Sequence, residues 1–363
     1  MTAPNRADVR ADVAIAGGGP AGAVTALLLA RAGADVVLFE RSRYDTFRLG
    51  ETLPPSVNPL LRELGLWDRF RALRSEPSYQ TASAWGAADP AERSFVFSPH
   101  GHGWHVDRAR FDAMLAKAAE DAGVRLLRGA AVRRVTRTDH GLIVDADASI
   151  RAGAVVDATG RGARIARSLG ATRDQLDRLV CAARVFSVPR QTVGDTFIEA
   201  APNGWWYASP LPEGRRLVAF FTDAGHAASA RLARGDGWGA ALARTEHTRR
   251  LASGHPAGKI HVATCASHEL CPAAGDSWIA VGDAALAVDP LSSGGVAFAL
   301  RSAGAAARVL LGSDRSTYES LVASAAKEYR EIRSQIYGWE QRFMDRDFWR
   351  MRAGEPAPAA SQR

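Results

Sequence analysis

A glycine-rich turn near the start of the sequence carries its clearest chemical signal. A short apolar run over residues 12–16 leads into Gly17-Gly18-Gly19-Pro20-Ala21-Gly22. Helical apolar spacing follows over 23–32, and a second apolar run over 35–40 ends in Glu40. A strand, such a turn, a helix and an acidic residue after the next strand form the unit that binds the pyrophosphate and ribose of a dinucleotide. We therefore expect a Rossmann-type dinucleotide site here.

The positions in this turn have separate physical roles. Gly17 permits the tight turn, Gly19 lets the backbone approach the pyrophosphate, and Gly22 allows close packing of helix on strand. Unpaired N–H groups at the helix N-terminus favour the phosphates. Glu40 is expected to accept hydrogen bonds from the ribose, and its charge disfavours a 2′-phosphate. The residues expected to bind the dinucleotide at this unit are Gly17, Gly19, Pro20, Ala21, Gly22, Glu40 and Arg41.

Two further turns follow predicted strands later in the chain. A strand over 154–157 runs into Asp157-Ala158-Thr159-Gly160, which returns the chain to the nucleotide-binding layer. A buried strand over 277–281 leads to Gly282-Asp283-Ala284-Ala285. A carboxylate after a buried strand, at the start of a helix, is well placed to accept a hydrogen bond from a ligand.

Together with Asp289-Pro290 and Gly294-Gly295, these motifs closely resemble the glutathione-reductase-type FAD fold. That fold is shared by single-component aromatic hydroxylases, geranylgeranyl reductases and flavin-dependent tryptophan halogenases, and the resemblance covers residues 10–312. It implies FAD as cofactor, with Asp283 on its ribityl or pyrophosphate side. The segment 291–295 resembles the family's loop along the pyrimidine edge of the flavin; an ordinary glycine-rich helix cap is the alternative.

The same resemblance assigns further residues to the cofactor. Arginines such as Arg48 and Arg108 lie beside FAD phosphates in the family, and a guanidinium suits that contact. A solvated position at a helix start is the alternative for Arg108. The further cofactor-binding residues that we expect are Arg48, Arg108, Val132, Asp157, Gly160, Asp283, Pro290, Ser293, Gly294 and Gly295.

Two other segments narrow the resemblance. Residues 48–55 and 205–211 are similar to segments of the tryptophan-halogenase-like group, and look closest to the LodB-, GoxB- and QhpG-like flavoproteins that modify tryptophan during the biogenesis of protein-derived quinone cofactors. Halogenases need a lysine that engages the hypohalous oxidant, and the corresponding position here is Gln80. Their Trp-x-Trp-x-Ile-Pro signature is also replaced, at 205–210. These departures favour oxygenation over halogenation.

The implied chemistry is an oxygen transfer. Reduced flavin and dioxygen give a C4a-hydroperoxide, an electrophilic oxygen donor that requires exclusion of water and an electron-rich acceptor ring. We therefore predict an FAD-dependent monooxygenase that oxidises an aromatic, tryptophan-like ring. The substrate is expected to be part of a peptide or protein partner, because remote contacts would then position the ring.

Three residues are candidates for the catalytic chemistry. Glu51, beside two prolines in a predicted flavin-side loop, could be an acid, a base or a helix cap. His105 could deprotonate or orient a substrate; His100 and His102 lie near it, but the glycines between them favour a mobile loop over a metal site, so we expect no metal. Trp206 could line an aromatic wall, or it could belong to the core.

The electron source stays open between NAD(P)H, bound transiently, and a separate flavin reductase. Gly235-Asp236-Gly237-Trp238-Gly239 does not follow a buried strand, so it fails as a second dinucleotide site. The alternative functions are a reductase or dehydrogenase of an apolar small molecule, a flavin-dependent halogenase, and a non-catalytic flavoprotein that assists the maturation of a partner.

Composition limits the other classes of function. The 363 residues carry a net charge of +7 that comes from scattered arginines, which argues against nucleic-acid binding. Three cysteines form no Cys-x-x-Cys pair and fit a reduced compartment. The first ten residues have no apolar core of a signal peptide, and no apolar stretch approaches about 18 residues. We expect a cytoplasmic protein without a membrane partner.

The predicted fold class is α/β: an FAD-binding Rossmann fold, an interleaved antiparallel β-rich substrate domain and C-terminal helices. Alternating segments over 196–200, 205–209 and 216–222 predict strands of the substrate domain. The expected segments are three FAD-binding parts at 10–78, 106–178 and 271–312, substrate-domain parts at 79–105 and 179–270, C-terminal helices at 313–352 and a disordered tail at 353–363.

Overall fold

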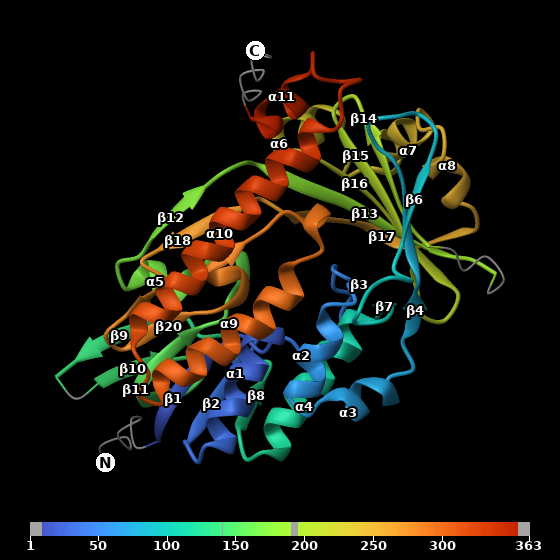
Figure 1. The fold of residues 1–363 in the computed structure, drawn as a ribbon. Helices are drawn as coiled ribbons and strands as arrows, with labels where there is room; N and C mark the ends of the chain where they lie inside the picture. The colour runs from blue at the N-terminus through green and yellow to red at the C-terminus, as the bar shows by residue number, and fades with distance from the viewer. Residues whose placement is uncertain (1–8, 140, 190–194, 355–363) are drawn as a thin grey trace, which may run out of the picture.

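The computed structural model describes residues 9–139, 141–189 and 195–354. The expectations for residues 1–8 and for most of the C-terminal tail, 355–363, lie outside this part of the chain. Two large sheets dominate the fold, and the helices pack on them (Figure 1). None of the helices in the described ranges is both long and apolar enough to cross a membrane.

The first sheet holds the nucleotide-binding layer. Its central strands are parallel. Strand β1 (Arg10–Ala16) pairs in parallel with β2 (Val36–Glu40) and β11 (Ser149–Asp157), and β11 pairs in parallel with β20 (Trp278–Ala280). Both faces of β2 are buried: Val36 and Leu38 join one core, and Val37 and Phe39 the other. The strands are, in sheet order, β19 (Ala274–Gly275), β20 (Trp278–Ala280), β11 (Ser149–Asp157), β1 (Arg10–Ala16), β2 (Val36–Glu40) and β8 (Arg125–Arg128), with the hairpin β9 (Arg134–Thr138) and β10 (Gly141–Asp145) beside β11.

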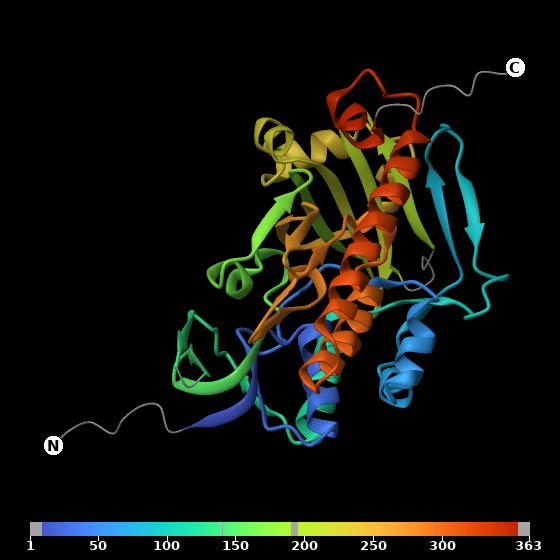
Figure 2. The same ribbon diagram turned by 60° about the vertical axis from the view of Figure 1, so that its left-hand side comes forward.

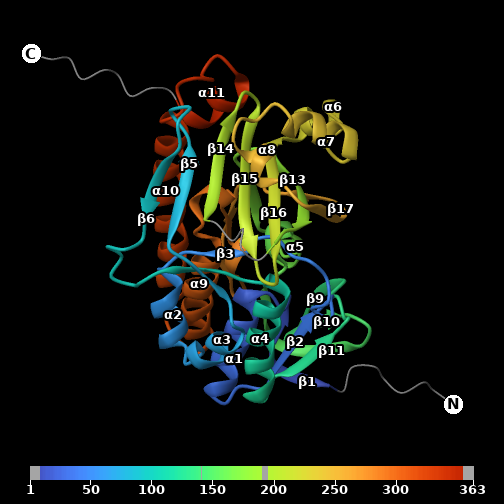
Figure 3. The same cartoon turned by 90° about the vertical axis from the view of Figure 1, so that its right-hand side faces the viewer.

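The second sheet has seven strands and is mostly antiparallel; only β14 and β5 pair in parallel. One face lies near helices α6 (Ala224–Ser229), α7 (Gly235–Leu242) and α8 (Thr248–Leu251). The other face is covered by α10 (Arg315–Gly338) and α11 (Asp347–Ala353) (Figures 2 and 3). The strands, in sheet order, are β17 (His255–Thr264), β13 (Leu179–Ser187), β16 (Arg215–Asp223), β15 (Gly204–Leu211), β14 (Thr196–Ala201), β5 (Gln80–Ala84) and β6 (Ala91–Ser94).

Two small sheets join the large ones. One consists of β3 (Thr52–Leu53), β7 (Gly103–His105) and β4 (Glu76–Ser78); the other of β12 (Thr172–Gln175), β18 (His268–Cys271) and β21 (Leu286–Ala287). The α-helices are α1 (Pro20–Arg31), α2 (Val57–Glu63), α3 (Trp67–Ala72), α4 (Arg108–Asp121), α5 (Arg164–Ser168), α6 (Ala224–Ser229), α7 (Gly235–Leu242), α8 (Thr248–Leu251), α9 (Gly295–Leu310), α10 (Arg315–Gly338) and α11 (Asp347–Ala353). Short 3-10 turns lie at Gly160–Gly162, Gly282–Ala284 and Pro290–Ser292.

The predicted fold class is confirmed. The βαβ opening and the three predicted strands of the second sheet are present, the latter as β14, β15 and β16. Strands β5 and β6 join that sheet although more than a hundred residues separate β5 from β14 in the chain (80 against 196). The glycine-rich segment at 235 follows helix α6 and a turn instead of a strand, so it is not a nucleotide-binding turn.

Trp206 belongs to the core beneath α7. It is 1% exposed, stacks on Phe220 at 4.7 Å between ring centroids and meets the edge of Trp238 at 5.3 Å.

We predict that Trp206→Ala lowers the free energy of unfolding by about 3–5 kcal/mol, because it leaves a cavity in this core. Urea unfolding measures the change. Trp339→Ala is the control: that ring is 59% exposed, and a change below about 0.5 kcal/mol is expected. An equally small effect of Trp206→Ala would contradict the assigned packing.

Candidate active site

The three glycine and aspartate motifs meet at the ends of the parallel strands. A Cβ atom on Gly17, whose φ is +111°, would lie 2.2 Å from the carbonyl oxygen of Ala158. A Cβ on Gly22 would lie 1.9 Å from the carbonyl oxygen of Gly17, and one on Gly282 would lie 2.8 Å from Cβ of Ala21. Only glycine permits these approaches, so the glycines bring the three motifs together around the start of α1.

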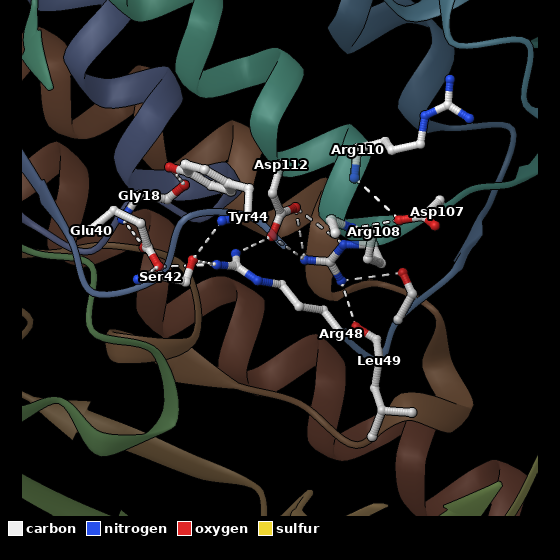
Figure 4. Close-up of polar contacts among 12 residues, drawn as sticks. Gly18, Glu40, Ser42, Tyr44, Arg48, Leu49, Asp107, Arg108, Arg110 and Asp112 are labelled. Carbon is white, nitrogen blue, oxygen red and sulfur yellow. Dashed lines mark hydrogen bonds and ion pairs between the residues drawn. The ribbon is translucent and has the colours of Figure 1, made fainter. Parts of the chain in front are cut away.

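The carboxylate of Glu40 lies beside this turn. It accepts hydrogen bonds from the backbone N–H of Gly18 at 2.8 Å and of Ser42 at 2.9 Å, and Arg48 approaches it at 3.0 Å (Figure 4). Burial opposes ionisation, but these hydrogen bonds and the charge of Arg48 outweigh it, so the pKa of Glu40 lies below its ordinary value. Glu40 is therefore an ionised acceptor, which fits ribose hydroxyls.

Arg48 and Arg108 converge on Asp112 of α4. Arg48 lies 2.6 Å from one carboxylate oxygen of Asp112, and Arg108 lies 3.2 Å from the other. Arg108 also donates to the backbone carbonyls of Leu49 at 2.9 Å and Gly50 at 3.2 Å (Figure 4). Both guanidinium groups thus hold the 48–50 segment against the nucleotide layer. Sequence reasoning missed Asp112, because an acidic residue inside a helix gives no signal of such a long-range contact.

The space beside Gly19 fits a pyrophosphate. A Cβ on Gly19 would meet no atom within 4 Å, in contrast to Gly17 and Gly22. Gly19 caps α1 without a side-chain hydrogen bond, and the first turn of α1 carries no acidic residue. Backbone N–H groups therefore face an open position at the positive end of a 12-residue helix. Arg41 is exposed nearby, and Val132 is half-buried just before β9.

Asp157 is fully buried, and its carboxylate stabilises the turn that follows it in the chain. Its carboxylate accepts hydrogen bonds from the backbone N–H and the hydroxyl of Thr159, and from the backbone N–H groups of Ile165 and Ala166. These contacts fix the turn that contains Gly160, so any cofactor contact of Asp157 would act through this backbone. Direct binding of FAD by Asp157 and Gly160 stays a prediction.

Asp283 lies near the start of α9. Its Oδ1 would be 3.9 Å from a Cβ on Gly295, and its Oδ2 is 3.3 Å from Nε of Arg161. The loop before α9 turns at Ser293, whose φ is +50°, after the turn that begins at Pro290. This arrangement brings Asp283 and the 290–295 loop to the same helix end.

A second group of polar side chains lies where β3 and β7 meet the second sheet. The hydroxyl of Thr52 contacts the hydroxyls of Tyr207 at 2.7 Å and Ser209 at 3.0 Å, and Nδ1 of His105 at 3.3 Å. Ser209 lies 3.2 Å from the same ring nitrogen. Glu51 precedes Thr52, is 2% exposed and accepts the backbone N–H of Gly50 at 3.0 Å. We call Glu51, Thr52, His105, Tyr207 and Ser209 the polar cluster.

Burial shifts the pKa of His105, Glu51 and Tyr207 in the polar cluster, and it raises that of Tyr207. It lowers the pKa of His105 to about 4, so the imidazole is neutral at neutral pH. The Nε2 atom of His105 is buried without a hydrogen-bond partner among the described residues. Burial raises the pKa of Glu51, partly offset by the Tyr207 hydroxyl and the charge of Arg108. The cluster thus contains a neutral imidazole with a free nitrogen and a carboxyl group that can hold a proton.

The polar cluster shares a core with two loops that the sequence assigned to the flavin. Phe47, Leu49, Leu291 and Tyr207 are half-buried and pack against one core, formed by the face of the second sheet that α10 and α11 cover. The segment before Glu51, the loop before α9 and Tyr207 therefore border the same apolar core.

The other predicted site residues are placed differently. Trp206 is not part of the polar cluster, because side chains alternate along β15 and its ring faces α7. Trp205 faces the other way but is buried, stacked on Phe221 at 4.0 Å. Asn58 donates to the carbonyls of His100 and His102, and no group that could hold a metal ion occurs within the described ranges. Gln80 donates to Asp195 at 2.7 Å.

Comparison with known proteins identifies the family. A family model for the FAD binding domain matches residues 10–337. The chain belongs to this family. It is an FAD-dependent oxidoreductase. A relative from Marinomonas mediterranea, named as FAD-dependent oxidoreductase LodB, is 30% identical over 357 residues. The alignment covers 94% of this chain and 96% of LodB.

Solved structures place the flavoprotein among halogenases and a tryptophan-modifying enzyme. The flavin-dependent halogenase CmlS is 26% identical, with a TM-score of 0.83 over 95% of this chain and 68% of CmlS. The peptidyl tryptophan dihydroxylase QhpG, essential for tryptophylquinone cofactor biogenesis, is 26% identical, with a TM-score of 0.76 over 98% of this chain and 81% of QhpG.

The flavoprotein should lose FAD when Gly19 is replaced by valine. The added side chain would fill the open position beside the helix N-terminus, and it meets no protein atom near Cβ, so the fold should remain. We expect flavin absorbance to disappear after gel filtration while far-ultraviolet circular dichroism matches that of the apoprotein. Gly22→Val is the comparison, since it should disrupt the fold itself. Stoichiometric FAD in the Gly19 variant would refute the assigned cradle.

The buried imidazole predicts a defined pH dependence of stability. The unfolded chain protonates His105 as the pH falls through about 6.5, but the folded protein does so only near a pKa of about 4. Its contribution to stability is therefore lost between these values, by about 2 kcal/mol from pH 7 to pH 5. Measured by urea unfolding, the stability advantage of the parent over His105→Gln should be smaller at pH 5 than at pH 7 by this amount. The exposed His255→Gln is the control, and a pH-independent difference for His105→Gln would contradict the prediction.

Proposed function

We propose that this flavoprotein is a monooxygenase that oxidises an aromatic, tryptophan-like ring within a peptide or protein. The observation that carries the proposal is the position of the buried polar cluster: Tyr207 shares one apolar core with Leu291 of the flavin-side loop and with Leu49. An aromatic substrate at this place would find apolar contacts, two ionisable groups and little water. The similarity to a peptidyl tryptophan dihydroxylase supports the same choice of substrate class.

The residues of the chain supply binding, orientation and proton handling. FAD, once bound and reduced, activates dioxygen and supplies an electrophilic oxygen atom. Glu40 would hold the ribose, and the backbone N–H groups in the first turn of α1 after Pro20 would hold the pyrophosphate. Glu51 is the group best suited to hold or release a proton, because it is buried within the polar cluster and burial raises its pKa. The free Nε2 of His105 orients a polar group of the substrate.

Halogenation is the second candidate, because the chain is 26% identical to a pyrrole-carbonyl carrier-protein chlorinase of Pseudomonas fluorescens over 90% of its length. The residue at the expected lysine position is Gln80, whose amide is engaged with Asp195. An amide lacks the cationic donor and the nucleophilic amine of lysine. The lysines of the sequence are Lys117, Lys259 and Lys327, and none precedes the second half of α4. We therefore rank oxygenation first.

The proposal includes an electron donor and a compartment. Either NAD(P)H or a separate flavin reductase supplies the electrons. The three cysteines are free, which fits a reduced, cytoplasmic compartment. Direct and partner-mediated reduction can be separated by following FAD bleaching under anaerobic conditions with NAD(P)H alone.

The central prediction concerns oxygen incorporation. With reduced FAD and dioxygen, tryptophan within a co-encoded protein should gain +16 or +32 mass units, whereas free tryptophan should react poorly, because remote contacts that position the ring are missing. Labelled dioxygen and mass spectrometry measure this. Glu51→Gln should lower kcat about 100-fold with FAD content unchanged. Chlorinated or brominated product in the presence of halide, or efficient turnover of the free amino acid alone, would contradict the proposal.

A further inference from the structure

Large apolar side chains are exposed at one end of the β5–β6 hairpin. Phe97 is 95% exposed, Val96 is 74% exposed and Tyr79 is 60% exposed. The backbone N–H of Phe95 donates to the carbonyl of Tyr79 at 2.8 Å, so these side chains belong to one ordered end of the hairpin. Such a group of exposed apolar side chains is typical of a surface that binds another polypeptide.

Strand β6 is the last strand of the second sheet. It pairs with β5 from Gln80↔Ser94 to Ser83↔Ala91, and within the described residues no strand pairs with its outer side. All residues of β6 are exposed, and the hairpin stands at the margin of the molecule (Figure 2). The outer N–H and C=O groups of such a strand can pair with the backbone of an added extended peptide.

A cationic cavity adjoins this end of the hairpin. It has a volume of about 300 Å³ and lies between α3 and β7, with Arg71, Arg74 and Ser75 on one side and His102 and Trp104 on another. Neither Arg71 nor Arg74 forms an ion pair or a side-chain hydrogen bond with any residue in the described ranges. Two unpaired guanidinium groups over an aromatic floor suit a carboxylate.

The cavity and the exposed apolar group are in contact, and the polar cluster begins at the next residue of the strand that carries Trp104. The ring of Tyr79 lies 5.1 Å from the ring of His102, and His102 lies 4.4 Å from Trp104. Trp104 is followed by His105 of the polar cluster on the same strand, β7. Figures 1 and 3 show β6 at the edge of the second sheet, with α3 below it. A polypeptide on this surface therefore lies beside the strand that carries a site residue.

We propose that the surface formed by Arg71, Arg74, Tyr79 and residues 91–97 binds an extended, acidic segment of the substrate polypeptide. The segment adds a strand to β6, places apolar side chains on Tyr79 and Phe97, and places a carboxylate between the two arginines. We call this surface the docking strip. The identity of the bound segment as part of the substrate rests on the proposed function. The extended, acidic character of that segment follows from the open strand edge and from the two unpaired arginines.

Peptide binding to the full-length protein loaded with FAD tests the docking strip. The probe is a labelled, end-blocked peptide of alternating glutamate and valine with one tryptophan; its partner has lysine in place of every glutamate. We expect the acidic peptide to bind at least about tenfold more tightly in fluorescence anisotropy. It should also slow hydrogen exchange over 91–97 and leave 134–138 unchanged, since β9 is an edge strand of the first sheet without the docking strip.

Matched charge reversals locate the contact. Arg71→Glu combined with Arg74→Glu should weaken binding of the acidic peptide at least about tenfold, whereas Arg133→Glu combined with Arg134→Glu changes the net charge equally and should leave it within about twofold. Phe97→Ser should also weaken binding. Equal affinity for both peptides, equal protection of β9, equal effects of both reversals, or protection of 91–97 by self-association alone would overturn the proposal. Binding is measured without turnover, so its failure is distinct from failure of the proposed oxygenation.

Discussion

The carboxylate of Glu40 ties the cofactor end of this protein to its substrate end. Glu40 holds the N–H of Gly18 and the guanidinium of Arg48, and Arg48 holds Asp112 on α4. Asp112 in turn binds Arg108, which grips the carbonyls of Leu49 and Gly50. Glu51 follows directly in the chain. A continuous series of ion pairs and hydrogen bonds therefore connects the turn at Gly18 to the residue that precedes Glu51.

This arrangement shifts the pKa values of two buried carboxyl groups in opposite directions. Glu40 receives several N–H donors, which outweigh burial, so its pKa falls. Glu51 has fewer compensating contacts, so burial dominates and its pKa rises. An ionised acceptor suits hydroxyl groups of a bound nucleotide, whereas a carboxyl group that exchanges its proton suits chemistry. The difference follows from local donors, since both groups are largely buried.

The features of the fold that could be predicted from the sequence are those that depend on residues close together in the chain. The turn at Gly17, the acidic residue that ends β2 and the alternation of β15 are all readable from neighbouring positions. Alternation does not say which face of β15 meets the flavin side, and for that reason Trp206 was considered for the site although it lies under α7. Asp112 was missed for another reason: its partner Arg48 is 64 residues away in the sequence and near only in the folded chain. The same holds for Tyr44, whose hydroxyl donates to the carbonyl of Gly18, 26 residues away. The glycines around His105 favoured a mobile loop, but pairing of β7 with β3 and β4 buries it.

Helix α10 connects the loop before α9 to the β5–β6 hairpin through contacts that do not involve Glu40. The hydroxyl of Tyr337 donates to Asp289 at 2.6 Å and accepts the indole N–H of Trp205 at 3.0 Å. Asp289 accepts the N–H of Leu291, which fixes the start of the loop before α9. At the same end of α10, the carbonyl of Ile336 accepts the indole N–H of Trp85, the residue that follows β5. The end of one helix therefore contacts both the segment that leads into α9 and the hairpin that carries β6, so the loop and the hairpin share a single structural support.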